Sequence, residues 1–396
     1  MVDKPWFRTL LSWMLDVQMV ILRVSYGCHR LTGGRSRPRG YVVGMEEIAG
    51  LLTAISSALD DVVTVNLASN PLYDHRYDVE FDIRGRHALA KRLRRLVVGP
   101  WVLGRLAARR RTFIYLGAEG FLISLVDGRD RELAFLRGHR RTVVCYFTGS
   151  DIRSQPMMNA FGERLRRDVL TTYEPLVSPG VATEAADRHR RRLARAAERH
   201  AQLIFNAAID QMSYFEGPTE PGLYFVPDER IGRRPEKWRD VSRPVIVHAP
   251  TSPIIKGTPL VRAALRSLEE EGYSFDYVEL MNQPNDVVLA TLDRAHIVMN
   301  QFYAFIPGIF GMEGLAANAV VLTSADRDIE HSLPPGANDA WVVTPFWKVY
   351  DNLKVVLDHP EKMQSQADRG TEWLRTHCSR SVDRATLLEL LAAVDD

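Results

Sequence analysis

Two series of short apolar strands that alternate with helices, separated by a proline-rich stretch, constrain this fold most strongly. The first series has predicted strands at 40–44, 62–67, 112–116, 142–147 and 203–206. The helices between them are predicted at 46–59, 88–111 with a break at Gly99-Pro100, 131–137 and 185–201. The second series has strands at 245–248, 275–279, 297–299, 320–322 and 341–343, with helices at 260–271 and 286–292. Such alternation predicts parallel sheets covered by helices on both faces, and therefore an α/β protein.

The chain is long enough for two domains. Its 396 residues exceed what one hydrophobic core usually supports, and five prolines punctuate the stretch from 218 to 244. We expect a helical extension at 1–39, a Rossmann-like domain at 40–225, a linker at 226–243 and a second Rossmann-like domain at 244–377. A C-terminal helix is expected at 378–396, with the N-terminal domain as its candidate packing surface. Two doubly wound domains would enclose a cleft between their strand ends, where ligands bind.

Composition narrows the class of partner. A formal net charge of +2 is too small to indicate binding to nucleic acid. Cys28, Cys145 and Cys378 are odd in number and far apart, which predicts neither a disulfide framework nor a zinc site. We therefore expect a reducing, cytoplasmic setting and no metal site.

Two features leave a membrane contact open. The apolar segment Leu10–Val24 is too short to span a bilayer and is interrupted by Asp16, Gln18 and Arg23. Packing on the protein or on a partner is the favoured interpretation, and a membrane surface is the alternative. Two arginine-rich stretches also have two interpretations. They are either solvated helix faces or sites for an anionic membrane or a phosphorylated acceptor. They comprise Lys91, Arg92, Arg94, Arg95, Arg109, Arg110 and Arg111, and then Arg188, Arg190, Arg191, Arg192, Arg195 and Arg199.

A glycine-rich turn before the predicted strand 320–322 has the chemistry of a phosphate site. Gly308 and Gly311 allow backbone conformations in which amides converge on an anion, and the following helix N-terminus adds its dipole. Glu313, one turn further, would repel phosphate but could accept hydrogen bonds from a ribose diol. The alternative is an ordinary loop, helix and strand connection with a solvated acid.

The strand at 142–147 leads directly into Thr148-Gly149-Ser150-Asp151-Ile152-Arg153. Asp151 there could orient a sugar hydroxyl, and Arg153 could bind a phosphate or carboxylate through two hydrogen bonds. The alternative is a turn in which Asp151 caps the next element and pairs with Arg153. Because strand ends border the expected cleft, the sequence favours a ligand role for Ser150, Asp151 and Arg153.

In this order, the motifs resemble a known family. His248 to Ser252, Lys256-Gly257-Thr258, Asn300-Gln301 and the run Gly311 to Ser324 are similar to the C-terminal half of GT-B glycosyltransferases, close to the retaining family 4 group. In the first half, the segments 113–122, 130–137 and 147–153 resemble a subset that carries the letters GSDIR. The resemblance begins near Tyr41, covers most of the chain and is strongest in the second half. It implies two Rossmann-like doubly wound domains that face each other across a cleft, with 40–225 as the acceptor domain and 244–377 as the nucleotide-sugar domain.

The resemblance implies roles for single residues. Lys256 corresponds to the lysine that neutralises the donor diphosphate, Glu313 to the acid that holds the ribose, and Gly311 and Met312 to the turn whose amides meet the diphosphate. Together with Thr251 and Ser252, these residues form the expected donor site. Ser150, Asp151 and Arg153 form the expected acceptor site, and Lys256 and Asp151 are the expected catalytic residues. The implied reaction moves a sugar from a nucleotide diphosphate sugar to an unidentified acceptor hydroxyl, without a metal or other cofactor and with retention.

The sequence also departs from the family pattern. Phe305 stands where the first of the paired acids is expected, and Pro250 replaces a frequent arginine. The segment 115–120 lacks a histidine often found at that strand end. Two alternatives therefore remain, a non-catalytic relative that binds a nucleotide sugar or a protein partner, and another GT-B enzyme such as an epimerase or phosphorylase. The predicted setting is cytoplasmic, with peripheral association with an anionic membrane left open.

Overall fold

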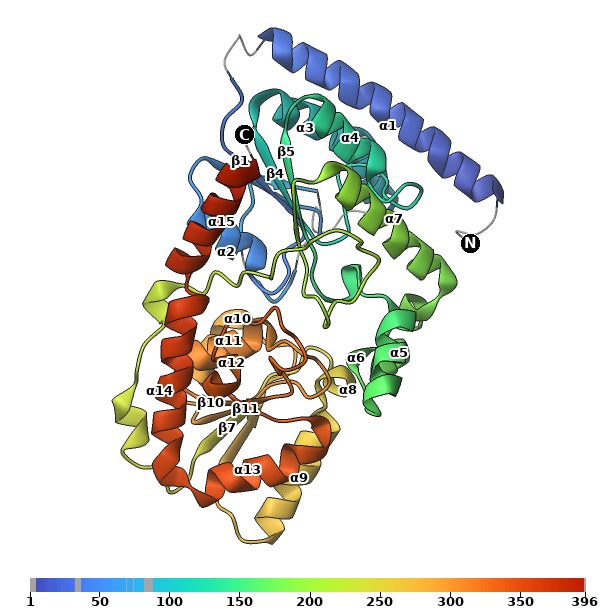
Figure 1. Cartoon of the computed structure of the whole chain (residues 1–396). Coiled ribbons are helices and arrows are strands. Elements are labelled where there is room, and N and C mark those ends of the chain that lie inside the picture. Colours follow the sequence, from blue (N-terminus) through green and yellow to red (C-terminus); the bar gives the residue numbers. More distant parts are fainter. Residues whose placement is uncertain (1–4, 33–36, 69, 74, 82–87, 395–396) are drawn as a thin grey trace.

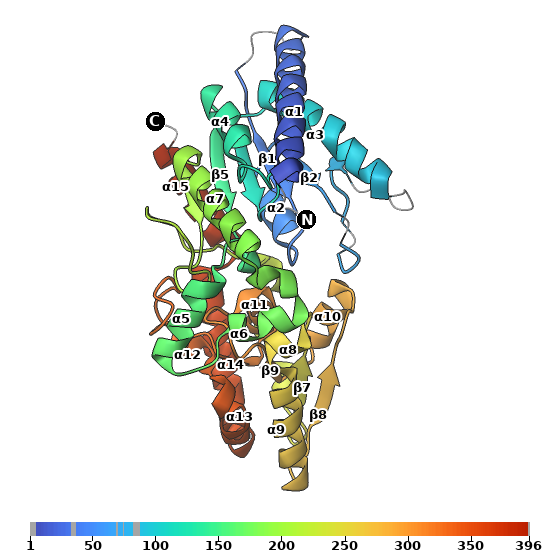
Figure 2. The same ribbon diagram turned by 90° about the vertical axis from the view of Figure 1, so that its right-hand side faces the viewer.

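The computed structural model describes residues 5–32, 37–68, 70–73, 75–81 and 88–394, with the helical backbone alone for 88–94 (Figure 1). It contains two parallel sheets, which confirms the predicted α/β architecture of two doubly wound domains. The six-stranded sheet of the N-terminal domain has the order β3-β2-β1-β4-β5-β6, and the five-stranded sheet of the C-terminal domain has the order β11-β10-β9-β7-β8. The sheets lie in separate halves of the molecule (Figures 1 and 2).

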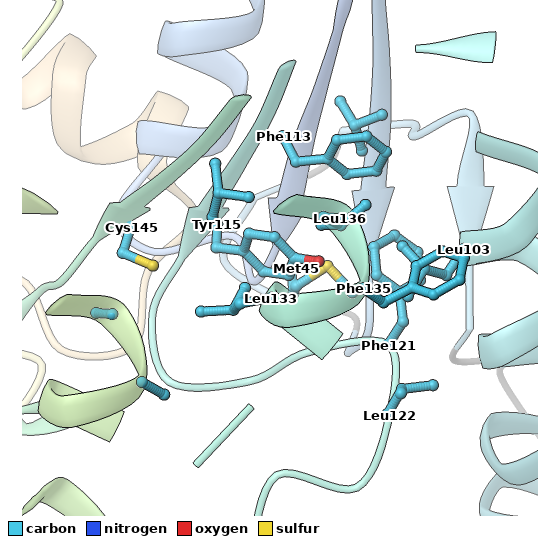
Figure 3. Packing of buried hydrophobic residues seen from close by; sticks show 14 of the residues in the cluster. Met45, Leu103, Phe113, Tyr115, Phe121, Leu122, Leu133, Phe135, Leu136 and Cys145 are labelled. Atoms are coloured by element: carbon cyan, nitrogen blue, oxygen red, sulfur yellow. The ribbon is translucent and has the colours of Figure 1, made fainter. Parts of the chain in front are cut away.

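The strands of the N-terminal domain are β1 (Tyr41–Met45), β2 (Val62–Asn66), β3 (Val79–Glu80), β4 (Thr112–Leu116), β5 (Thr142–Tyr146) and β6 (Leu203–Phe205). Its helices after the extension are α2 (Leu51–Ala58), α3 (Ala88–Arg109), α4 (Asp130–Gly138), α5 (Gln155–Leu165), α6 (Leu170–Val177) and α7 (Glu184–His200). Every residue of β4 and β5 is buried, because helices cover both faces of the sheet. Figure 3 shows the core on one of these faces, where Phe113 and Tyr115 pack with Leu133, Leu136 and other apolar side chains.

The C-terminal domain has strands β7 (Val245–His248), β8 (Asp276–Glu279), β9 (Ile297–Met299), β10 (Val320–Thr323) and β11 (Val342–Val343). Its helices are α8 (Pro253–Lys256), α9 (Thr258–Glu270), α10 (Asn285–Leu292), α11 (Gly308–Ala316), α12 (Ala337–Ala340), α13 (Val349–Asp358) and α14 (Pro360–His377). All strands of the second series were predicted within two residues of their observed bounds. Runs of β-branched residues between turn signals explain this agreement.

The N-terminal extension is one long helix, α1 (Pro5–Thr32), which lies along the outside of the N-terminal domain beside α3 (Figures 1 and 2). Gln18, which interrupts the apolar segment, is buried and donates to the carbonyl of Leu96 at 3.2 Å. That carbonyl lies four residues before Pro100, which has no N–H to donate. The contact explains why α3 continues through Gly99-Pro100, so the predicted break there was wrong. No helix in the described part of the chain is both long and apolar enough to cross a membrane.

Helix α2 begins five residues later than predicted. Ala49 and Gly50 have φ angles of 53° and 81°, which lie outside the right-handed helical region and delay the start to Leu51. The Glu47 carboxylate accepts hydrogen bonds from the amides of Leu52 and Thr53 at 3.1 and 3.2 Å, so it caps the helix from the preceding loop. Glu46 consequently lies at the end of β1 and not inside a helix.

The chain passes between the domains at two adjacent places. Val226 donates to the carbonyl of Cys378 at 3.1 Å and accepts from the amide of Arg380 at 2.7 Å. Helix α15 (Arg380–Val394) then runs beside the N-terminal domain, where its Leu387 and Leu391 pack in a cluster with Leu52 and Ile55 of α2 (Figure 1).

Candidate active site

A cleft of about 1080 Å³ lies between the carboxyl ends of the two sheets. The N-terminal domain lines it with Glu46 after β1 and with Thr148 to Asp151 after β5, and the C-terminal domain with Thr251 to Lys256 after β7 and Gln301 after β9. The structure therefore brings several of the predicted site residues to one cavity. They are Ser150, Asp151, Arg153, Thr251, Ser252 and Lys256.

Lys256 is the cation on the C-terminal side of the cleft. It ends the short helix α8, and Gly257 with a φ of 79° turns the chain into α9. Its Nζ donates to Oε1 of Gln301, and Nε2 of Gln301 donates to the carbonyl of Ile306. Burial lowers the pKa of Lys256 to about 8, and the nearby Asp210 carboxylate only partly opposes this. A desolvated ammonium at this place gains strongly from an anionic ligand.

The N-terminus of α11 faces the same part of the cleft. Gly308 has a φ of 64° and lies at the first position of the helix, and Gly308 and Ile309 line the cleft. A Cβ on Gly308 would lie 3.7 Å from Nε2 of Gln301, so this helix N-terminus adjoins the partner of Lys256. Amides at a helix N-terminus and an ammonium together are a suitable site for a diphosphate.

Gly311 and Met312 lie deeper than expected. Gly311 is already inside α11, and the prediction that it occupies the glycine turn was wrong. It is glycine because a Cβ there would lie 2.5 Å from Nδ2 of Asn300. The Met312 side chain is fully buried in the domain core. Neither Gly311 nor Met312 lines the cleft. Gly308 and Ile309 line it instead, at the place beside the diphosphate that the family resemblance assigned to Gly311 and Met312.

Glu313 is covered by a segment of the opposite domain. Its Oε1 accepts a hydrogen bond from Nδ2 of Asn285 at 3.1 Å, and the amide of Asn285 donates to the carbonyl of Leu72 at 3.0 Å. Burial raises the pKa of Glu313 to about 7, although the Asn285 hydrogen bond and the charge of Arg230 oppose it. The pKa of Tyr73 is also raised, by burial first and then by the Glu313 carboxylate. Glu313 is thus a partly buried acceptor one helical turn beyond Ile309, and it does not itself line the cleft.

Asp151 and Glu46 form the acidic side of the cleft. Oδ2 of Asp151 accepts from the amide and hydroxyl of Thr148 at 3.1 and 2.9 Å, so the acid caps its own turn as the sequence alternative proposed. Burial raises the pKa of Asp151, and these hydrogen bonds oppose the shift. Both carboxylates lie near Gly117, where a Cβ would be 2.8 Å from Oε2 of Glu46 and 3.4 Å from Oδ2 of Asp151.

Glu46 is a site residue that the sequence did not predict. Burial, followed by the charges of Asp151 and Glu119, raises the pKa of Glu46 to about 7. Within the described ranges it accepts no hydrogen bond, and it lines the cleft. Its position directly after a buried strand was the available signal, which the predicted helix start at Glu46 obscured.

Arg153 is held between two carboxylates. Its NH1 donates to Glu174 Oε1 and its NH2 to Asp210 Oδ2, both at 2.8 Å, and all three side chains are at least nine-tenths buried. The pairing with Asp151 that the sequence offered as an alternative is not formed. Asp210 also accepts from the amide of Phe305 at 2.6 Å, so the ion pairs reach the C-terminal domain.

Phe305, which replaces the family's first acid, packs between the domains. It is buried with Met158 and Val169, and its ring meets that of Phe161 of α5 edge to face at 5.8 Å between centroids. Helices α5 and α6, which the sequence did not predict, supply this surface. The Phe305 side chain thus serves domain packing.

Comparison with solved structures supports the architecture. The chain is similar to sucrose-phosphate synthase from Thermosynechococcus elongatus, with a TM-score of 0.56 and 11% identity over 91% of this chain and 99% of that one. It is also similar to the catalytic domain of starch synthase IV from Arabidopsis thaliana bound to ADP and acarbose, with a TM-score of 0.51 and 10% identity over 90% and 99% of the two chains. UDP-GlcNAc 2-epimerase from Neisseria meningitidis has a TM-score of 0.49 and 10% identity over 90% and 100%. No protein-family model and no curated protein sequence matches this chain.

The fold is therefore GT-B-like. At identities of 10 to 11% the likeness establishes the fold alone. Any activity has to be argued from the residues of the cleft.

Proposed function

We propose that this chain is a glycosyltransferase that moves a sugar from a nucleotide diphosphate sugar to an acceptor hydroxyl. One observation carries the proposal. A desolvated lysine, Lys256, lies near the N-terminus of α11 in the lining of an interdomain cleft, and both elements come from the C-terminal domain. This arrangement supplies positive charge where a departing diphosphate would accumulate negative charge.

In the proposed mechanism the donor lies along the C-terminal domain. The Lys256 ammonium and the amides near Gly308 hold the diphosphate, the hydroxyls of Thr251 and Ser252 border it, and the Glu313 carboxylate accepts hydrogen bonds from the ribose. The hydroxyl of Ser252 is buried and has no hydrogen-bond partner in the described part of the chain, so it is available to a ligand. As the bond from the sugar to the diphosphate breaks, the interactions with Lys256 strengthen, and this difference lowers the barrier. Since the protein supplies the positive charge, the proposed transfer needs no metal ion.

The acceptor would approach from the N-terminal domain. Glu46 and Asp151 lie side by side across the cleft and can accept hydrogen bonds from an incoming hydroxyl, while Ser150 is exposed at the same edge. Retention of the anomeric configuration completes the proposal, by analogy with the family that the sequence resembles.

The proposal is tested by calorimetry with a panel of nucleotide diphosphate sugars, followed by incubation of the bound donor with candidate acceptors. A glycosylated product with the donor's anomeric configuration by NMR, formed also in the presence of EDTA, is the expected result. Tight donor binding with neither transfer nor hydrolysis would identify a non-catalytic binding protein. Release of a free sugar changed at its C2 position would identify an epimerase.

Glu313→Gln should separate ribose recognition from diphosphate binding. The amide keeps the shape of the side chain but loses a carboxylate that accepts hydrogen bonds from the diol, so nucleoside diphosphate affinity should fall about tenfold. Pyrophosphate has no ribose, and its affinity should not change. Calorimetry with both ligands measures the difference, and Glu269→Gln on exposed α9 is the control. Equal losses for both ligands would refute the ribose assignment.

Glu46→Gln should impair transfer while donor affinity stays as in the wild type. The substitution removes one carboxylate from the side of the cleft where the acceptor would approach. The kcat/KM for the acceptor should therefore fall about tenfold or more. In the wild type this rate constant should also fall as the pH drops through about 7, because Glu46 becomes neutral. Initial rates across pH measure both effects, with Glu163→Gln on α5 as the control. A pH profile unchanged by Glu46→Gln would contradict the role.

A further inference from the structure

An exposed apolar stripe runs along the outer face of α1, and no element of the described structure packs over it. Its members are spaced by three and four residues and therefore lie on one side of the helix. The opposite side of α1, with Leu15, Met19 and Leu22, is buried against the domain. The stripe is formed by Trp6, Leu10, Trp13, Val17, Val20 and Val24, with exposed fractions between 40% for Val17 and 63% for Trp13.

Helix α3 extends this face. Ser25 of α1 donates to the carbonyl of Trp101 at 2.6 Å, and the Trp101 ring lies 5.7 Å from His29, so the exposed Trp101 adjoins one end of the stripe. Exposed Val97 of α3 lies next to Leu96, which Gln18 contacts. An exposed apolar surface of this extent, with three tryptophans, is typical of a contact site.

The charge around the stripe is one-sided. The sequence of α1 has three arginines against one aspartate, and that of α3 has six basic residues and no acidic one, in a chain with a formal net charge of +2. The one acid, Asp16, is paired with Arg131 of α4. Arg23 and Arg30 of α1 and Arg105 of α3 are exposed, while Arg95 of α3 pairs with Glu119. The two helices thus combine an exposed apolar stripe with an excess of positive charge.

These charges decide between two occupants. A second copy of the chain would use the same face and place two positive surfaces together, which opposes the apolar gain. An anionic bilayer suits both the apolar stripe and the positive charge, because tryptophans favour the membrane interface and arginines are attracted to anionic headgroups. A helix of 28 residues is about 42 Å long and lies flat on such a surface.

We infer that α1 and α3 form a docking face for an anionic lipid bilayer, with the α1 stripe inserted at the level of the headgroups. The inference does not rest on the proposed transferase activity, because it concerns a surface that shares no residue with the cleft. It assigns the N-terminal extension a role in placing the protein on a membrane.

The test is flotation of the full chain with vesicles. With equal parts of phosphatidylcholine and phosphatidylglycerol the protein should float, and with phosphatidylcholine alone or at high salt it should stay behind. Val20→Glu should lower partitioning about tenfold. Arg105→Glu should lower it at least about fivefold, because loss of the positive charge alone has about this effect near an anionic surface and the substitution also adds a negative charge.

Val355→Glu on α13 is the matched control, because Val355 and Val20 are both 57% exposed. It should bind vesicles like the wild type, and Arg266→Glu on α9 should do so too. Circular dichroism should show all four variants folded, since each position is exposed. Three results would overturn the inference: no flotation of the wild type with anionic vesicles, equal flotation of Val20→Glu and Val355→Glu, or a wild-type dimer that Val20→Glu dissociates without any vesicle binding.

Discussion

Lys256→Met should lower the rate of sugar transfer about 100- to 1000-fold and weaken nucleoside diphosphate binding at least about tenfold. Methionine keeps the length of the side chain and removes the charge next to the N-terminus of α11. The larger effect on rate follows from the growth of negative charge on the leaving diphosphate, which makes the lysine more important in the transition state than in the bound donor. Steady-state kinetics and calorimetry measure the two quantities separately.

The pH dependence gives an independent check on this lysine. In the free protein the pKa of Lys256 is lowered to about 8, so the ammonium is charged below that pH and neutral above it. A bound diphosphate favours the charged form and raises the pKa again. Donor affinity should therefore fall about tenfold per pH unit above pH 8 in the wild type. In Lys256→Met it should be weak and flat over the same range.

Lys348→Met is the matched control for both measurements. Lys348 is a half-exposed lysine of the C-terminal domain that pairs with Asp351, and it does not line the cleft. Its substitution should leave transfer, affinity and pH profile unchanged. A Lys256→Met protein that keeps the affinity and pH profile of the wild type would refute the diphosphate assignment.

Arg153→Met should cost the largest amount of stability, about 3–5 kcal/mol. The substitution leaves the carboxylates of Glu174 and Asp210 buried without their cation. The free-energy cost of these unpaired buried charges exceeds the net stabilisation that the ion pairs contribute. Because Asp210 also holds the amide of Phe305, the contact between the domains should loosen at the same time. Calorimetry should show a transition lowered by roughly 10 °C.

The control for Arg153 is Arg243→Met, which removes an ion pair with Asp276 whose side chains are 64% and 51% exposed. Exposed pairs contribute less than about 1 kcal/mol, so its transition should hardly move. Equal shifts in the two variants would mean that the buried ion pairs do not stabilise the domains. A stable Arg153→Met protein that has lost acceptor binding alone would instead restore the sequence-based role of Arg153 as a ligand.

The sequence predicted those parts of the fold that depend on local pattern. Strands such as β4 and β5 are continuous apolar runs between turns, and such runs need no tertiary information. Helix α3 was broken in the prediction because the donor that compensates for Pro100 is Gln18, far away in the chain. Helices α5 and α6 were missed, and Pro156, Gly162 and Pro175 leave little helical pattern in that segment.

The candidate site, too, could be predicted only where it depends on local sequence pattern. Asp151, Lys256 and Gly308 lie in the connections that follow predicted strands, so their meeting at one cleft could be anticipated. That Glu313 is covered could not be anticipated, because the cover depends on the contact between Asn285 and Leu72 of the opposite domain. The burial of Phe305 was also beyond the sequence, since its partners belong to the helices that were not predicted.

The adjacent crossings at Val226 and Arg380 make the C-terminal domain an insertion within the N-terminal one. The inserted domain is continuous in sequence and can fold as soon as it is synthesised. The N-terminal domain is discontinuous, because Leu387 and Leu391 of α15 complete the cluster around α2. During synthesis, therefore, the domain that is translated first is the one that is finished last, and it leaves that apolar surface uncovered until α15 has been made.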